Sequence, residues 1–162
     1  FSTLVDKSSL ELKLIDASAE TTFIPPTAPL GVSAARETRI PDIDGSPRSP
    51  LVEVPLETLA WGRSGDKGDK ANIGVIARKP DYLPWIATTL TEAYVADRFA
   101  HFMTSPGIDR YYLPGISALN FLLHNALGGG GIASLRNDPQ AKAFAQVLLD
   151  TPIMIPQHLL EA

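Results

Sequence analysis

The 162-residue sequence contains no cysteine, which excludes disulfide frameworks, thiol nucleophiles and cysteine-ligated zinc or iron–sulfur sites. It holds only three histidines, too few for a histidine-rich metal site. No apolar run approaches the roughly 20 residues that a membrane-spanning helix needs. We therefore expect no bound metal and no membrane segment.

Basic residues are also scarce, because 14 Lys and Arg stand against 18 Asp and Glu, which gives a formal net charge of -4. A general nucleic-acid binder would carry a basic stripe, and this chain has only one short basic segment. The amino end has acidic residues among its apolar ones and lacks the apolar core of a signal peptide. These features predict a cytoplasmic protein that binds neither nucleic acid nor a membrane.

The two parts of the chain differ in proline content. Residues 1–50 hold six of the 14 prolines among Ser, Thr and Asp, which predicts a linker or the end of a preceding domain. Leu10–Asp16 is the exception, because leucines alternate there with charged residues as in a strand with one buried face. Residues 51–162 have the pattern of a packed domain, and their length fits a single one.

Strands and helices alternate in the packed part. A strand is expected at 51–61, directed toward a sheet edge by Pro55, and a second strand at 71–77 forms a hairpin with it. One helix should begin after Thr91 and end near Ser105-Pro106-Gly107, and another should begin at Asp138-Pro139. The remaining strands are expected at 108–113, 116–124 and 152–156, although the periodicity of the second also allows a short helix.

From residue 72 onward the order of elements is therefore β-α-β-β-α-β. This order predicts an α+β fold, namely a ferredoxin-like split β-α-β sandwich. Its antiparallel sheet would have two helices on one face, and the strand at 51–61 would be an additional N-terminal strand of that sheet.

The most informative segment is Gly62–Arg78, GRSGDKGDKANIGVIAR, which places glycines at 62, 65 and 68 between the first two expected strands. Glycine adopts positive φ without a Cβ clash, so the N–H groups of such a loop can turn inward around an anion. Five of the 14 basic residues lie between positions 62 and 79. The segment is therefore a locally basic loop on an acidic protein.

Two readings of this loop remain open. Arg63 and Lys67 would add charge-assisted hydrogen bonds to a bound carboxylate or phosphate. Alternatively, Asp66 and Asp69 cap the loop amides and pair with those cations, which makes a rigid hairpin without a ligand. A magnesium or calcium site at the two aspartates has little support, because at least four more ligands would be needed.

Further candidate residues lie outside the loop. His124, at the end of an apolar run and before Gly128–Gly131, is a candidate catalytic residue because imidazole transfers protons near neutral pH; alternatively, it is a hydrogen-bonded histidine at a sheet end. Asn120 lies within the same apolar run, so its amide either fixes the strand or faces a ligand. His101 follows Asp97 by four residues, which favours an exposed pair over an acid–base site.

Several separated blocks together resemble a known family. They are GRSGDKGDKANIGVIAR, the pair His101-Phe102, RYYLPGISALNFLLHNALGGGG and SLRNDPQAKAFAQVLLD. Over roughly residues 53–156 the chain resembles the carboxy-terminal ferredoxin-fold domain of the AtuA family, named for acyclic terpene utilisation. Residues 1–50 would then be the end of a larger amino-terminal domain and its linker, which suits a chain that opens on Phe1 and not on methionine.

The resemblance implies a role in the catabolism of acyclic terpenoids or other branched acids as CoA thioesters. It also implies an AtuA-like amino-terminal domain as partner, in cis or as a separate chain. It assigns no chemical step, so whether the module is itself an enzyme stays open. No cofactor is expected, because acyl-CoA would be a substrate.

We therefore expect a module that binds the anionic group of a small acyl substrate and forms a homo-oligomer. The expected ligand-binding residues are Arg63, Ser64, Gly65, Asp66, Lys67, Gly68, Asp69, Asn72, Asn120 and His124. The alternative function is a non-catalytic interaction or oligomerisation module whose polar loop is structural.

Overall fold

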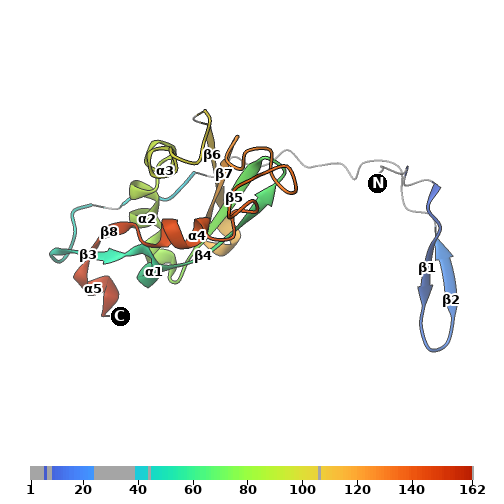
Figure 1. Cartoon of the computed structure of the whole chain (residues 1–162). Helices are drawn as coiled ribbons and strands as arrows, with labels where there is room; N and C mark the ends of the chain where they lie inside the picture. The colour runs from blue at the N-terminus through green and yellow to red at the C-terminus, as the bar shows by residue number, and fades with distance from the viewer. Residues whose placement is uncertain (1–5, 7–8, 24–38, 44, 106, 162) are drawn as a thin grey trace. The chain divides into compact units, whose positions relative to one another are not determined.

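The computed structural model describes residues 6, 9–23, 39–43, 45–105 and 107–161 (Figure 1). The chain divides into two compact units, Phe1–Glu37 and Thr38–Ala162. The interpretation of residues 1–50 as a linker or the end of a preceding domain, ahead of a domain at 51–162, remains a prediction.

The described residues of the first unit form a hairpin of β1 (Leu12–Ile15) and β2 (Glu20–Phe23). Asp16 shapes the turn, because its Oδ1 accepts hydrogen bonds from the backbone N–H groups of Ser18 and Ala19 at 2.7 and 2.9 Å. The strand expected within Leu10–Asp16 is confirmed. Its expected buried face is wrong for the described residues, since both strands are exposed throughout.

The second unit is built on a four-stranded antiparallel sheet in the order β4-β5-β7-β6. Its strands are β4 (Ala60–Lys67), β5 (Lys70–Ala77), β6 (Ile108–Leu113) and β7 (Ala118–Leu123). Alternate residues of β5 and β7 are fully buried, as expected for strands with one covered face. The hairpin of the first two strands is confirmed, and the apolar run before His124 is a strand and not a helix.

A separate two-stranded sheet pairs β3 (Leu51–Pro55) with β8 (Pro152–Pro156). The last strand thus does not join the larger sheet, and β4 occupies the position beside β5. The single strand expected at 51–61 is also wrong, because α1 (Leu56–Leu59) separates β3 from β4. Leu56 and Leu59 are both fully buried, so this helical turn carries two core side chains that a continuous strand would place on opposite faces.

The remaining helices are α2 (Leu83–Thr89), α3 (Glu92–Arg98), α4 (Phe144–Leu149) and α5 (Gln157–Leu160). A 3₁₀ turn at Pro80–Tyr82 leads into α2, which the sequence reading missed. None of the helices in the described ranges is long and apolar enough to cross a membrane.

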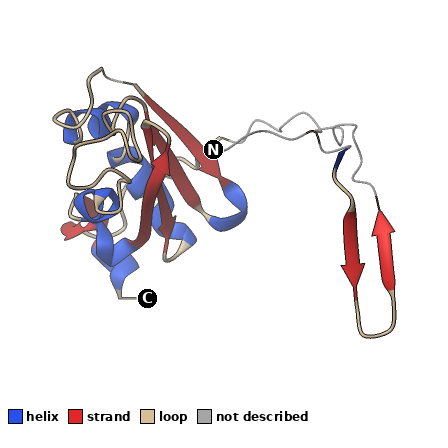
Figure 2. Cartoon of the chain, turned by 45° about the vertical axis from the view of Figure 1, so that its right-hand side comes forward, coloured by secondary structure: helices blue, strands red, loops and turns tan. Residues whose placement is uncertain are grey.

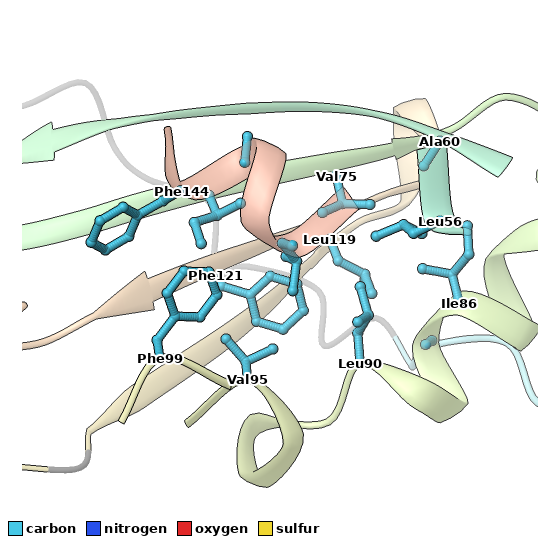
Figure 3. Packing of buried hydrophobic residues seen from close by; sticks show 14 of the residues in the cluster. Leu56, Ala60, Val75, Ile86, Leu90, Val95, Phe99, Leu119, Phe121 and Phe144 are labelled. Atoms are coloured by element: carbon cyan, nitrogen blue, oxygen red, sulfur yellow. The ribbon is translucent and has the colours of Figure 1, made fainter. Parts of the chain in front are cut away.

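Helices α3 and α4 meet over one face of the sheet. The rings of Phe99 and Phe144 stack with their centroids 5.1 Å apart, close to Phe121 of β7 (Figure 3). Figure 2 shows most helices on one side of the strands. The expected α+β, ferredoxin-like class is therefore confirmed.

The start of α3 agrees with the sequence, because Thr91 Oγ1 accepts a hydrogen bond from the Tyr94 N–H at 3.1 Å. Its end does not, since α3 stops at Arg98 and not near Ser105. Phe99 instead begins a series of tighter turns, in which the Phe102 N–H donates to the Phe99 carbonyl at 2.9 Å.

The start of α4 is also corrected. Asp138 does cap two amides, because its carboxylate accepts the N–H groups of Lys142 and Ala143, both at 2.8 Å. Ala141 adopts a φ of +53°, however, which is incompatible with a right-handed helix. The helix therefore begins only at Phe144.

Candidate functional site

The glycine-rich segment is a strand and not a loop. β4 pairs with β5 from Ala60 opposite Ala77 to Lys67 opposite Lys70, which leaves a two-residue turn. Gly68, in that turn, has a φ of +67°, whereas Gly62 and Gly65 lie within β4. Because the backbone of this segment pairs with β5, the expected concave cradle of amide donors is wrong.

Strand geometry sends the predicted ligand-binding residues of β4 to opposite faces. Ser64 is buried on the helix-covered face, where its Oγ accepts the Ala145 N–H at 2.8 Å and lies 3.4 Å from the Lys142 carbonyl oxygen. Asp66 follows on the same face of β4. Ser64 therefore anchors the start of α4 and is not available to a ligand.

The hairpin turn holds the glycine run Gly128–Gly131. Asp69 Oδ1 accepts the Gly129 N–H at 2.6 Å, and the Asp69 carbonyl accepts the Ala126 and Leu127 N–H groups at 3.0 and 3.1 Å. A Cβ on Gly130 would lie 1.9 Å from the Gly68 carbonyl oxygen, so only glycine fits there. Gly68 and Asp69 thus have a structural role. Asp69 caps an amide of the glycine run, whereas the structural alternative expected it to cap amides of its own loop.

The other face of the sheet collects several predicted site residues in one place. The pairing register aligns Arg63, Gly74 and Asn120 across three strands, and Gly65 lies opposite Asn72 in the next row of that face. Asn72 Nδ2 donates a hydrogen bond to Asn120 Oδ1 at 2.6 Å. We call the group of Arg63, Gly65, Asn72, Gly74, Asn120 and Lys142 the β4–β5 patch.

Lys142 joins the β4–β5 patch from outside the sheet. Its Nζ lies 3.6 Å from the position that a Cβ of Gly65 would occupy. The sequence reading missed it, because nothing in the sequence shows that residues after the glycine run return to the edge of β4. Within the described ranges, neither Lys142 Nζ nor the Arg63 guanidinium has a hydrogen-bond or ion-pair partner. Lys67, by contrast, donates to the Asp66 carbonyl at 3.0 Å.

Packing does not require the glycine at position 74. A Cβ there would meet the Arg63 carbonyl oxygen at 3.8 Å and Asn120 Oδ1 at 4.0 Å, which are ordinary contacts. Glycine in a strand interior costs roughly 0.5–1 kcal/mol relative to alanine. Gly74 therefore leaves an open space between Arg63 and Asn120, and it lowers the stability of the strand relative to alanine.

His124 lies apart from the patch. It follows β7 and stands four residues from Asn120, which corresponds to about 13 Å along a strand. Its Nε2 is 2.8 Å from Asp109 Oδ2, and the Tyr111 hydroxyl donates to the same oxygen at 3.3 Å. His124 thus does not contact Asn120, although Tyr111, which shares Asp109 with it, pairs directly with Asn120.

Two pKa shifts belong to this second cluster. The hydrogen bond from His124 is the main cause that lowers the pKa of Asp109, and the negative charge of Asp109 is the main cause that raises the pKa of Tyr111. The sequence reading missed both residues, although the strand it expected at 108–113 already puts positions 109 and 111 on one face.

The remaining candidates have structural surroundings. No hydrogen bond joins His101 to Asp97, and the His101 ring packs against Phe102 with centroids 4.1 Å apart. In the part of the chain that the structure describes, no group of three or more His, Asp or Glu residues is arranged to hold a metal. A cleft of about 310 Å³ lined by Asp81, Trp85 and His158, among others, contains none of the predicted site residues.

Together, the fold and the β4–β5 patch define a ferredoxin-like α+β domain with a polar site on the sheet face opposite α3 and α4. The family model of the AtuA ferredoxin-like domain matches residues 54–154, and the chain therefore belongs to that family. No curated protein and no solved structure matches the chain.

Proposed function

We propose that this domain binds a small anionic group at the β4–β5 patch. It does so as the carboxy-terminal module of an AtuA-like protein that acts in the catabolism of acyclic terpenoid or other branched acyl-CoA compounds. The anion-binding part of the proposal rests on the arrangement of the patch. The metabolic part rests on family membership and on no feature of the patch itself.

The main observation in favour of an anion site is that a glycine, Gly74, lies next to an arginine without an ion-pair partner among the described residues, Arg63. Gly74 leaves room next to Asn120, and Arg63 stands in the same row with no carboxylate partner for its guanidinium among the described residues. Guanidinium binds carboxylate or phosphate through two parallel hydrogen bonds. The amide groups of Asn72 and Asn120, fixed by their mutual hydrogen bond, add donors and acceptors next to it.

A substitution that fills the site tests this proposal. Gly74→Val should keep or slightly raise the melting temperature, because a Cβ meets only ordinary contacts and valine favours strands. It should weaken binding of 3-methylbutanoate, a small branched carboxylate, by about tenfold, since one well-placed charged hydrogen bond is worth about that much. The measurement is ¹⁵N chemical-shift titration of the full chain.

Arg63→Gln should cause a similar loss of affinity without loss of stability, because the Arg63 side chain has no partner in the described structure. Arg48→Gln is the matched control, since it removes the same charge ahead of β3 and should leave binding unchanged. If both Gly74→Val and Arg63→Gln bind 3-methylbutanoate as the parent chain does, the anion site is wrong.

In this proposal His124 does not contact the anionic group. Its side chain, oriented by Asp109, is a proton-transfer group for a ligand that extends from the patch along β7. It does not contribute to holding the anionic group itself.

A second candidate function, an interaction module, is favoured by apolar residues on the same face. Trp61, Ile76 and Leu113 lie in one row across the sheet and are 54%, 39% and 39% exposed. Arg78 lies over the Trp61 ring at 4.7 Å and leaves it half exposed. An AtuA-like amino-terminal domain or a second copy of the chain would cover this row, and loss of stability with unchanged ligand affinity in Arg63→Gln would support this candidate.

A further inference from the structure

We infer that Lys142 turns the β4–β5 patch into a two-cation site that selects a doubly charged phosphate group over a carboxylate. This inference rests on the proposed function, because it uses the same patch. It adds the residue that decides which anion is bound and the chemical class of that anion.

Hydrogen bonds to the backbone of Lys142 hold this residue next to the patch. Its N–H donates to Asp138 Oδ1 at 2.8 Å. Its carbonyl oxygen lies 3.4 Å from the hydroxyl of Ser64, on the opposite face of β4. Because both backbone groups of Lys142 are held beside the edge of β4, its side chain reaches around that edge to Gly65.

The contacts of Ser64 with Lys142 and Ala145 also link the covered face of β4 to the segment that carries the Lys142 side chain. Ser64 accepts the Ala145 N–H at 2.8 Å, and this bond is buried, so the start of α4 is fixed to the strand that carries Arg63 and Gly65. The backbone segments that carry the two cations are therefore joined, although Lys142 and Arg63 are far apart in the sequence.

The spacing of the cations suits one small anion. Arg63 and Gly65 are two residues apart on the same strand face, which corresponds to about 7 Å along a strand. Lys142 Nζ lies beside Gly65, and the side chain of Arg63 starts two residues away on the same strand face, next to Gly74 in the pairing register. A tetrahedral phosphate group placed there has oxygens for both cations and for the asparagine amides.

The charge count favours phosphate. A carboxylate is a monoanion with two oxygens, and the guanidinium of Arg63 alone satisfies both. A phosphate monoester carries a charge of about −1.5 to −2 at pH 7 and offers three acceptor oxygens. Among the described residues no carboxylate pairs with Arg63 or Lys142, so both positive charges are available. Arg63 would neutralise one negative charge of a phosphate, and Lys142 would neutralise the second.

The test compares two probes on the full chain by ¹⁵N chemical-shift titration at pH 7.5 and low salt. Methyl phosphate should bind at least about tenfold more tightly than acetate. Lys142→Gln should remove most of this preference while acetate binding stays within about twofold, because acetate needs only Arg63. Lys142→Arg should restore the preference. Lys67→Gln is the matched control, since Lys67 is held by the Asp66 carbonyl and should leave both affinities unchanged.

The outcomes separate this inference from the proposed function. If acetate binds and depends on Arg63, but methyl phosphate has no advantage and Lys142→Gln changes nothing, the anion site stands and the role of Lys142 is wrong. If neither probe shifts the patch resonances, both are wrong. Adenosine 3′,5′-bisphosphate, as a third probe, distinguishes a nucleotide-borne phosphate, which would bind more tightly than methyl phosphate, from a simple phosphate ester, and either result supports phosphate selection.

Discussion

At the scale of single residues, Asp109 has two hydrogen-bond partners on the sheet face that the helices leave uncovered. One of its oxygens, Oδ2, receives both His124 Nε2 and the Tyr111 hydroxyl. The hydrogen bond from His124 favours the ionised carboxylate and lowers the pKa of Asp109 below the ordinary value of 3.8. The resulting stabilisation is present above that value and is lost as the pH falls through the lower pKa of the folded state.

Removal of the imidazole tests this assignment. In His124→Ala the pKa of Asp109 should rise toward 3.8, because its largest stabilising contact is gone. The measurement is a ¹³C titration of the Asp109 carboxyl group between pH 2 and 6. His101→Ala serves as control, since that ring packs on Phe102 and should leave the pKa of Asp109 unchanged. If the pKa of Asp109 is the same in His124→Ala as in the parent chain, the hydrogen bond between His124 and Asp109 is wrong.

At the scale of elements, the β4–β5 hairpin and the glycine run support each other. The backbone of Gly130 lies against the Gly68 carbonyl, and Gly128–Gly131 all have positive φ. Asp69 joins the two segments through its carboxylate and its carbonyl. This contact sets the path of the chain that later returns Lys142 to β4, so the loop is part of the frame of the site.

Alanine substitutions at Gly130 and Gly131 test this contact, because both glycines have positive φ but only Gly130 lies against Gly68. Gly131→Ala should cost about 1 kcal/mol, because its φ of +47° disfavours alanine while nothing lies within 4 Å of the new Cβ. Gly130→Ala should cost at least about 2 kcal/mol more, since its Cβ would lie 1.9 Å from the Gly68 oxygen and the backbone must move. Urea denaturation of both variants gives the difference, and equal costs would show that the two segments do not touch.

At the scale of the whole molecule, the hydrophobic core of the described residues lies within the second unit. Every residue of the core cluster, and every half-buried residue packed against it, lies at Ile40 or beyond. The described strands of the first unit are exposed along both faces, and a two-stranded hairpin alone is at best marginally stable in water. The stability of the domain is thus expected to reside in Thr38–Ala162.

A shortened chain tests this expectation. A protein that begins at Thr38 should unfold cooperatively with a melting temperature within about 2 °C of the full chain, because no described residue before Thr38 belongs to the core cluster. Differential scanning calorimetry of both proteins provides the comparison. A decrease of more than about 5 °C would show that the first unit contributes to the folded core.

Much of the fold could be predicted because local patterns agree with it. Alternation at 71–77 and 108–113 gave strands at nearly the observed bounds, and Thr91 marked the start of α3. The errors have definite causes. The helical turn at Leu56–Leu59 is too short for a periodic pattern, and Ala141 takes a left-handed conformation that no propensity scale assigns to alanine.

The candidate site was found in part. Arg63, Gly65, Asn72 and Asn120 do lie together, although the sequence argument placed them around a loop and the structure places them on a sheet face. Lys142 and Gly74 were missed, because their place in the patch depends on strand register and on the return of a distant segment. His124 was included on its chemistry and contacts Asp109, which shares a face of the sheet with the patch.

Local sequence patterns were enough to predict most strands of the sheet, the start of α3 and the family. Side-chain periodicity and caps act over a few residues, and the blocks that identify the family are read without any structure. Only the tertiary structure decided which side chains share a face, because a shift of one residue in strand register moves every side chain to the other side of the sheet. That is why Ser64 became a buried anchor while its neighbours Arg63 and Gly65 face the patch.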